Sequence, residues 1–171
     1  MKKTHLLATA ALALTMIAPG AMANDSKMTQ EFVKTAAVAG QFEIESSKLA
    51  LEKSTDKDIK QFAQKMIDEH TNAANKLKAT VQASGVDTNL VTTDLDSKHQ
   101  KIMNNLQEAK GDDFDKEYIE AQKDAHKDAV SLFSKYSTSG DDKPLQDFAK
   151  QTLPTLEKHQ DHVKELKADK S

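Results

Sequence analysis

The sequence contains no cysteine, no tryptophan and no arginine. The lack of cysteine excludes a disulfide scaffold, a thiol enzyme, a zinc ribbon and a covalent haem-attachment motif. All 24 basic residues are lysine, so the protein cannot form the bidentate contacts that arginine makes with phosphates and base edges. Because acidic residues outnumber basic ones and no basic cluster occurs, we expect neither a nucleic acid nor an anionic membrane surface as a partner.

Residues that break or disfavour helices are also scarce. Only 5 Gly and 3 Pro occur among the 171 residues, and 5% of the residues are aromatic. Such a composition, together with abundant Ala, Lys, Asp, Glu and Gln, favours helix over sheet. The length corresponds to one domain with room for a hydrophobic core.

Residues 1–23 have the pattern of a secretory signal peptide. Two lysines precede an apolar run over residues 6–18, and Ala21-Met22-Ala23 has the small-x-small form of a cleavage site. The apolar run is too short to cross ~30 Å of hydrocarbon as a helix. We therefore predict cleavage before Asn24 and a single periplasmic domain over residues 24–171. Peripheral association with the outer membrane stays open.

The predicted mature chain has further consequences for how the protein is held together. Removal of residues 1–23 leaves 148 residues, with 22 lysines against 27 acidic residues and a net charge of −5. We expect no transmembrane segment in this chain, because no later stretch is apolar enough. With no cysteine in an oxidising compartment, the fold must be stabilised by burial alone.

Apolar residues recur at helical spacing over four long segments and one shorter segment. The candidate N-caps are Asp25 or Ser26, Thr55, and Asp112 or Asp113. A left-handed cap is expected at Gly85. The predicted helices cover approximately residues 27–53, 56–83, 94–110, 112–139 and 143–167.

These segments predict an all-α fold: a ferritin-like four-helix bundle with an additional short helix in the connection between the second and third long helices. The first two long helices are joined by a very short link and should be antiparallel. Residues 86–111 could return the chain along the bundle, which gives the up-down-down-up order of ferritin-like folds. They could instead pack as a fifth helix on an up-down-up-down bundle. The length of this connection favours the former order.

Polar side chains fall inside the apolar stripes of all four long helices. At 100° per residue, Glu43 lies about 20° from Phe32, and His70 lies about 20° from Ile59. The same calculation places Gln122, His126 and His159 within or at the edge of the stripes of their helices. All of these residues are near the middle of their helices, so we expect them to meet in one layer.

Two interpretations of this polar layer remain. The side chains can hydrogen-bond to one another and fix the register of the helices. Alternatively, they can bind a divalent metal such as zinc, with Gln122 supporting the ligands. The candidate metal ligands are Glu43, His70, His126 and His159.

Several other activities have no support in the sequence. A ferritin-like di-iron site needs Glu three residues before its His, but Ile67, Lys123 and Leu156 occupy those positions. No Gly-x-Ser-x-Gly motif and no glycine-rich phosphate loop occurs. We expect His162 to be a solvated surface residue and His99 to be exposed or partly packed. The pattern therefore favours a protein that is not an enzyme.

The order of several short motifs resembles the DUF4142 family of secreted bacterial proteins, which are often labelled outer membrane proteins. The matching residues are Phe32-Val33, Ala36-Ala37, Glu43-Ile44, Leu49-Ala50, Phe62-Ala63, Met66-Ile67-Asp68-Glu69-His70, Phe114-Asp115, Tyr118, Gln122, His126, Leu132-Phe133 and Leu153-Pro154-Thr155-Leu156-Glu157-Lys158-His159. The family usually has Asp and His adjacent, whereas Glu69 stands between Asp68 and His70 here. The resemblance implies a ferritin-like helical bundle and assigns no activity.

The sequence thus predicts a non-enzymatic periplasmic helical-bundle protein that binds a protein partner or a small ligand, with a link to envelope stress. The alternative function is metal binding by the Glu and His residues inside the bundle. The identity of the ligand or partner and the oligomeric state stay open.

Overall fold

The computed structural model describes residues 26–167. The predicted signal peptide and its cleavage site lie outside these residues. The described part forms five α-helices and one 3₁₀ turn and contains no strand. The elements are α1 (Lys27–Lys53), α2 (Lys57–Ser84), η1 (Thr88–Leu90), α3 (Ser97–Glu108), α4 (Asp112–Ser139) and α5 (Lys143–Glu165). An all-α bundle with a short extra helix between the second and third long helices is therefore confirmed.

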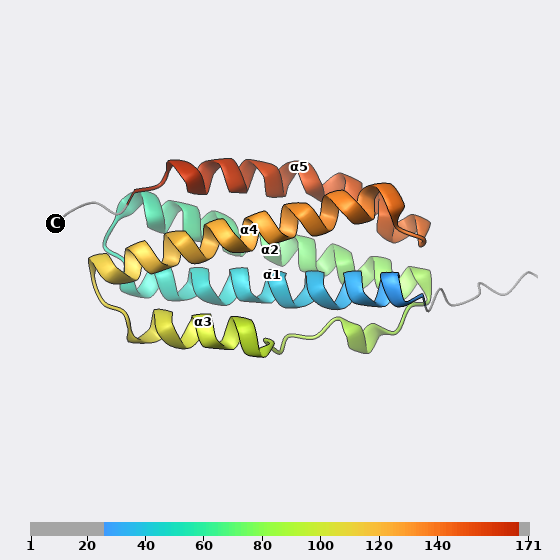
Figure 1. Cartoon of the computed structure of the whole chain (residues 1–171), viewed down its shortest axis with the longest axis horizontal. Coiled ribbons are helices and arrows are strands. Elements are labelled where there is room, and N and C mark those ends of the chain that lie inside the picture. Colours follow the sequence, from blue (N-terminus) through green and yellow to red (C-terminus); the bar gives the residue numbers. More distant parts are fainter. Residues whose placement is uncertain (1–25, 168–171) are drawn as a thin grey trace, which may run out of the picture.

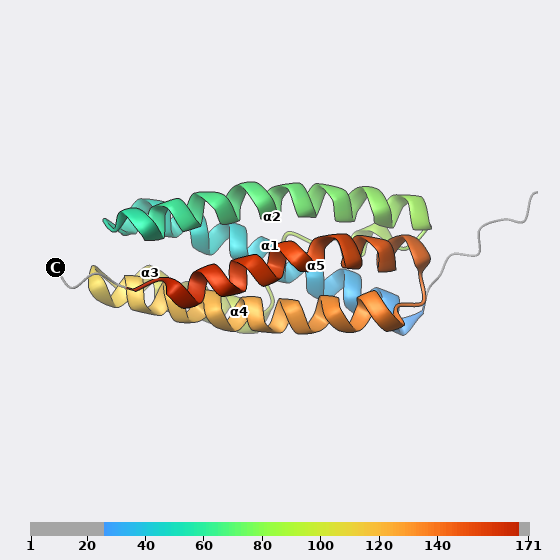
Figure 2. The same cartoon turned by 90° about the horizontal axis from the view of Figure 1, so that it is seen from above.

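The four long helices pack as a square (Figures 1 and 2). Helices α1 and α5 each pack against both α2 and α4. Helix α1 is therefore diagonally opposite α5, and α2 is diagonally opposite α4. Helix α1 is antiparallel to α2, and α4 is antiparallel to α5 (Figure 1). The connection through η1 and α3 runs back along the bundle, so α4 starts at the same end as α2 (Figure 1). The order is up-down-down-up, with the single long crossover that ferritin-like folds also have.

Side-chain hydrogen bonds cap the N-termini of several helices, although the capping residue is not always the expected one. The Ser26 side chain accepts a hydrogen bond from Thr29 N at 3.1 Å and caps α1. The cap of α2 is Asp56, which accepts from two backbone N–H groups. The prediction of Thr55 was wrong because the helix begins two residues later, at Lys57. The Asp142 carboxylate caps α5 by accepting from Leu145 N.

Two glycines mark changes of chain direction at positive φ. Gly85 ends α2 with φ of 72°, as predicted from its position. Gly111 precedes α4 with φ of 52° and occupies the N-cap position without a side-chain hydrogen bond. The prediction that Asp112 or Asp113 caps α4 was therefore wrong. Both lie in the first helical turn, where acidic side chains favourably face the positive end of the helix dipole.

The buried apolar residues form two clusters, one toward each end of the bundle. One includes Phe32, Phe133 and Phe148, and the other includes Phe62 and Tyr118. Along each long helix, the predicted inward-facing polar residues occur where one cluster gives way to the other. The polar layer therefore lies near the middle of the bundle, with apolar packing on both sides.

Helix α1 is buried on a second side that its apolar stripe did not indicate. Phe42 is fully buried although it lies outside the predicted stripe. Its ring is 4.9 Å from the ring of His99, because α3 packs along the outer side of α1. Within residues 26–167, no helix combines the length and the apolar character needed to cross a membrane.

Candidate metal centre

Three buried histidines from three helices meet in the polar layer. His70 lies on α2, His126 on α4 and His159 on α5, and their exposed fractions are 7%, 0% and 1%. Their ring centroids are 5.4 to 5.7 Å apart. One ring nitrogen from each histidine lies within 4.8 Å of those from the other two. The fold thus brings together three imidazoles from distant parts of the chain.

Two of the three rings are held through their second nitrogen. His126 Nδ1 is 2.9 Å from the backbone carbonyl oxygen of Gln122, one helical turn earlier. His159 Nε2 is 2.6 Å from Glu69 Oε2. Because both partners are acceptors, these nitrogens donate their N–H, and the other nitrogen of each ring carries a lone pair. Metal-binding histidines are typically oriented by hydrogen bonds of this kind.

The nitrogens on the opposite sides of these rings have no hydrogen-bond partner. His126 Nε2 and His159 Nδ1 are both buried, and so is His70 Nε2. Unpaired polar atoms are rare inside proteins, because burying them without a partner costs free energy. Three such atoms in adjoining rings form a set of lone pairs that a cation would satisfy.

Burial keeps His70 and His159 in the neutral form that binds metals. Desolvation lowers the pKa of His70 well below its ordinary value, and the neighbouring His126 and His159 lower it further. Desolvation also lowers the pKa of His159 to about 4, although its hydrogen bond to Glu69 acts in the opposite direction. At neutral pH no proton has to leave either ring before an ion binds.

Glu43 lies beside His126 and does not belong to the three-histidine group. Its carboxylate is 3% exposed, and its Oε1 is 3.6 Å from His126 Nδ1, the nitrogen that bonds to the Gln122 carbonyl. Burial raises the pKa of Glu43, while His126 and the side chain of Gln122 oppose this rise. Neither carboxylate oxygen has a hydrogen-bond partner.

Gln122 supports the cluster through its backbone and its side chain. Its carbonyl orients His126, and its Nε2 donates to Ser46 Oγ at 3.1 Å. Ser46 Oγ in turn donates to the carbonyl oxygen of Phe42 at 2.7 Å. The hydrogen bond from Gln122 to Ser46 links α4 to α1.

Glu69 was not among the residues predicted for the polar layer. Its side chain is 39% exposed and lies at the edge between α2 and α5. Residues adjacent in a helix point about 100° apart, so Glu69 is outside the inward stripe that contains His70. The one sequence feature that could have indicated a role for Glu69 is its position directly before the inward-facing His70.

The remaining two histidines of the described chain lie outside the cluster. His99 is partly buried against Phe42, and its Nδ1 is 2.7 Å from Asp96 Oδ1. His162 was expected at the surface in solvent, but it is partly buried, with the centroid of its ring 5.2 Å from that of Phe62. Both therefore have packing roles that do not involve the three-histidine group.

The geometry suits a four-coordinate ion with three protein ligands. Zinc–nitrogen bonds of 2.0–2.1 Å in a tetrahedral site place the donor atoms about 3.4 Å apart. The three nitrogens are already within 4.8 Å, so rotations that move each ring atom by about 1 Å would complete the site. The fourth position would be filled by a molecule from outside the chain, as in sites with three histidines and an open position.

A family model with the description "Domain of unknown function (DUF4142)" matches residues 14–166. The chain belongs to the DUF4142 family. No curated protein and no solved structure matches it. Membership in DUF4142 assigns no activity, so the function has to be argued from the chemistry of the site.

Proposed function

We propose that this DUF4142 protein is a periplasmic metal-binding protein that holds one divalent transition-metal ion, such as zinc, between His70, His126 and His159. The observation that carries the proposal is the convergence of three buried ring nitrogens within 4.8 Å. On each ring a buried nitrogen lacks a hydrogen-bond partner, and two of the rings are held by acceptors on the other side. Imidazole is a preferred ligand of zinc and of neighbouring transition metals.

A purely structural hydrogen-bonded layer explains these contacts less well. In such a layer, His70 Nε2, His126 Nε2 and His159 Nδ1 would pair with one another or with Glu43. None of these three nitrogens makes a hydrogen bond to another ring of the group or to Glu43. Neutral imidazoles with free lone pairs are instead what a metal ion requires.

The compartment is proposed from the signal-peptide pattern of residues 1–23. The positive start, the short apolar run and the Ala21-Met22-Ala23 site support export across the inner membrane. In the periplasm the mature domain would act by binding its ion, and we propose no catalytic step for it.

The function is tested with untagged protein, because a histidine tag would itself bind metal. We expect about one metal ion per chain by elemental analysis after purification. We also expect zinc to raise the melting temperature of protein treated with a chelator. At zinc 100-fold above Kd, the stabilisation is about 2.7 kcal/mol, which corresponds to roughly 5–11 °C for a protein of this size.

Two histidines on the same helix provide a matched control. His159→Leu removes a proposed ligand and should abolish the shift in melting temperature with zinc. His162→Leu makes the same chemical change three residues later, outside the group, and should preserve the shift. The proposal fails if zinc, copper, manganese and iron all leave the melting temperature unchanged at neutral pH and no metal co-purifies.

A further inference from the structure

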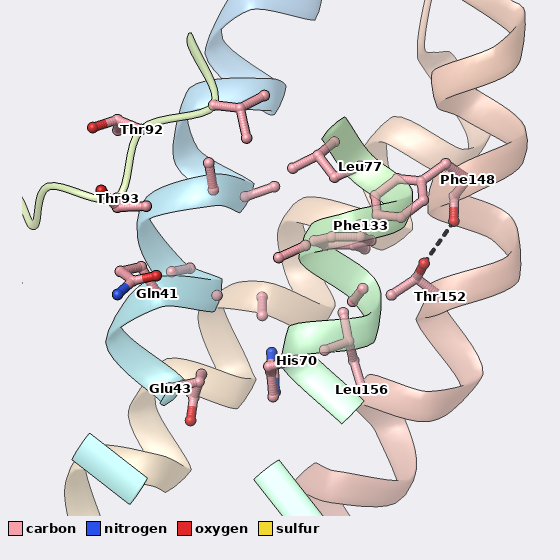
Figure 3. A pocket seen from close by; sticks show the side chains of 18 residues that line it. Gln41, Glu43, His70, Leu77, Thr92, Thr93, Phe133, Phe148, Thr152 and Leu156 are labelled. Carbon is pink, nitrogen blue, oxygen red and sulfur yellow. Dashed lines mark hydrogen bonds between the residues drawn. The ribbon is translucent and has the colours of Figure 1, made fainter. Parts of the chain in front are cut away.

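A small cavity adjoins the candidate metal centre and is lined by α1, α2, α4, α5 and the connection at residues 91–93 (Figure 3). Its volume is about 90 Å³. Glu43 and His70 lie at one end, and Leu77 and Phe148 lie toward the other (Figure 3). The wall between these ends consists mainly of small residues, which include Ala36, Gly40, Ala73 and Ala74. No lysine is among the residues that line the cavity.

The polar end of the cavity and the metal centre share a residue. His70 lines the cavity and also belongs to the three-histidine group. The buried atoms His70 Nε2 and both oxygens of Glu43 have no hydrogen-bond partner. A molecule in the cavity would therefore have its polar end against the metal centre and its apolar end against Leu77 and Phe148.

We propose that the cavity holds an external ligand of the bound metal ion: a small monoanion with an apolar body of about two to four carbon atoms, such as a short-chain carboxylate. This inference rests on the proposed function, because the anionic group is recognised through the ion. Three neutral imidazole ligands carry no charge of their own to offset that of a divalent ion, and they leave one coordination position open.

The size and charge of the cavity select this class of ligand. A dry protein cavity of about 150 Å³ accommodates benzene, so 90 Å³ suits a smaller body. Without a lysine in the lining, the ion would be the principal positive charge, which disfavours phosphate and other polyanions.

Gly40 is a position from which a substituted side chain would enter the cavity. A Cβ atom at this position would have no atom within 4 Å, and Gly40 lines the cavity. Glycine inside a helix is less stable than alanine by roughly 0.5–1 kcal/mol. A larger residue at position 40 should therefore fill the cavity without unfolding α1, and Gly40→Leu is the principal test variant.

The test uses the full mature chain loaded with Co²⁺, whose visible absorption reports its ligands. Acetate, propionate and butyrate are titrated separately, with phosphate as the anion that has no apolar body. Each buried CH₂ contributes about 0.8 kcal/mol, which is roughly a fourfold gain in affinity. We expect butyrate to bind about 15-fold more tightly than acetate, and phosphate to bind more weakly than butyrate.

Variants then locate the apolar body of the ligand. Gly40→Leu should remove the gain with chain length while Co²⁺ affinity stays unchanged. Ala73→Leu fills the cavity from the α2 side and should have the same effect. Thr35→Leu adds the same side chain at an exposed position of α1 and should retain the gain.

The outcomes separate this inference from the proposed function. If Co²⁺ binds but its spectrum does not change on addition of the carboxylates, the proposed cavity ligand is wrong and the metal site stands. The result has the same meaning if acetate, propionate and butyrate bind with affinities within twofold of one another. The same conclusion follows if both cavity-filling variants keep the full gain with chain length. If Co²⁺ does not bind to the unmodified protein, the proposed function and this inference both fail.

Discussion

His159 Nε2 on α5 and Glu69 Oε2 on α2 lie 2.6 Å apart, in a contact between residues separated by 90 positions. The imidazole is 1% exposed, whereas the carboxylate is 39% exposed and reaches it from the edge of the bundle. The bond orients the His159 ring so that its Nδ1 lies buried without a hydrogen-bond partner. A partly exposed acid thus positions a buried candidate ligand.

Removal of the Glu69 carboxylate should weaken metal binding without destroying it. Mutation of a residue that orients a ligating histidine typically costs 10–100-fold in metal affinity. We expect this loss for Glu69→Gln, measured by competition between the protein and a coloured zinc chelator. The matched control is Asp68→Asn, one residue earlier, where the exposed carboxylate accepts from Gln64 Nε2. Equal zinc affinities for the two variants would contradict the role of Glu69.

The metal-free protein should lose stability on mild acidification. Burial lowers the pKa of His70, and it lowers that of His159 to about 4 even though Glu69 opposes the shift. Between about pH 6.5 and pH 4, the unfolded chain therefore binds protons that the folded chain does not. The free energy of unfolding should fall with decreasing pH, by up to about 1.4 kcal/mol per pH unit for each such histidine.

The contributions of individual groups to this pH dependence differ in sign. His70→Leu removes one group with a lowered pKa and should make the decline shallower. The pKa of Glu43 is raised, so this group favours the folded state at low pH and loses that contribution as the pH rises through its folded pKa. Glu43→Gln should therefore make the decline steeper. Urea titrations at pH 7, 6 and 5 with a chelator present measure both slopes, and equal slopes in all three proteins would refute this assignment.

Core truncations test the side of α1 that faces α3 and the interior of the four-helix bundle. Phe62 and Phe42 are fully buried, so Phe62→Ala and Phe42→Ala should each cost ~3–5 kcal/mol in the free energy of unfolding. The exposed Met28 provides a control, since Met28→Ala should change stability by less than ~0.5 kcal/mol. A loss below about 1 kcal/mol for Phe42→Ala would mean that α3 does not cover α1 in solution.

Processing of the N-terminus checks the proposed compartment. We expect the periplasmic fraction to contain a chain that starts at Asn24, as determined by N-terminal sequencing or intact mass. A substitution of Ala23 by a bulky residue should block cleavage, because signal peptidase sites require small residues. Recovery of the full-length unmodified chain in the inner membrane would contradict export and cleavage.

The amino-acid sequence determined the features that depend on neighbouring residues. Helix α1 has the predicted bounds, Lys27–Lys53, and Gly85 ends α2 in the left-handed conformation. The burial of Glu43 and His159 also followed from the sequence. Periodicity and capping act over a few residues, so a single chain segment contains the information needed to predict them.

The tertiary structure decided which of these inward side chains meet, and how. It groups three histidine nitrogens and leaves Glu43 beside His126. It also brings Glu69 to His159 and covers Phe42 with α3. Helical phase gives the direction of a side chain around one axis, but contacts between helices depend on their relative rotation and axial shift. Those two quantities come from the packing of the whole bundle, and for this reason the candidate metal centre became visible only in three dimensions.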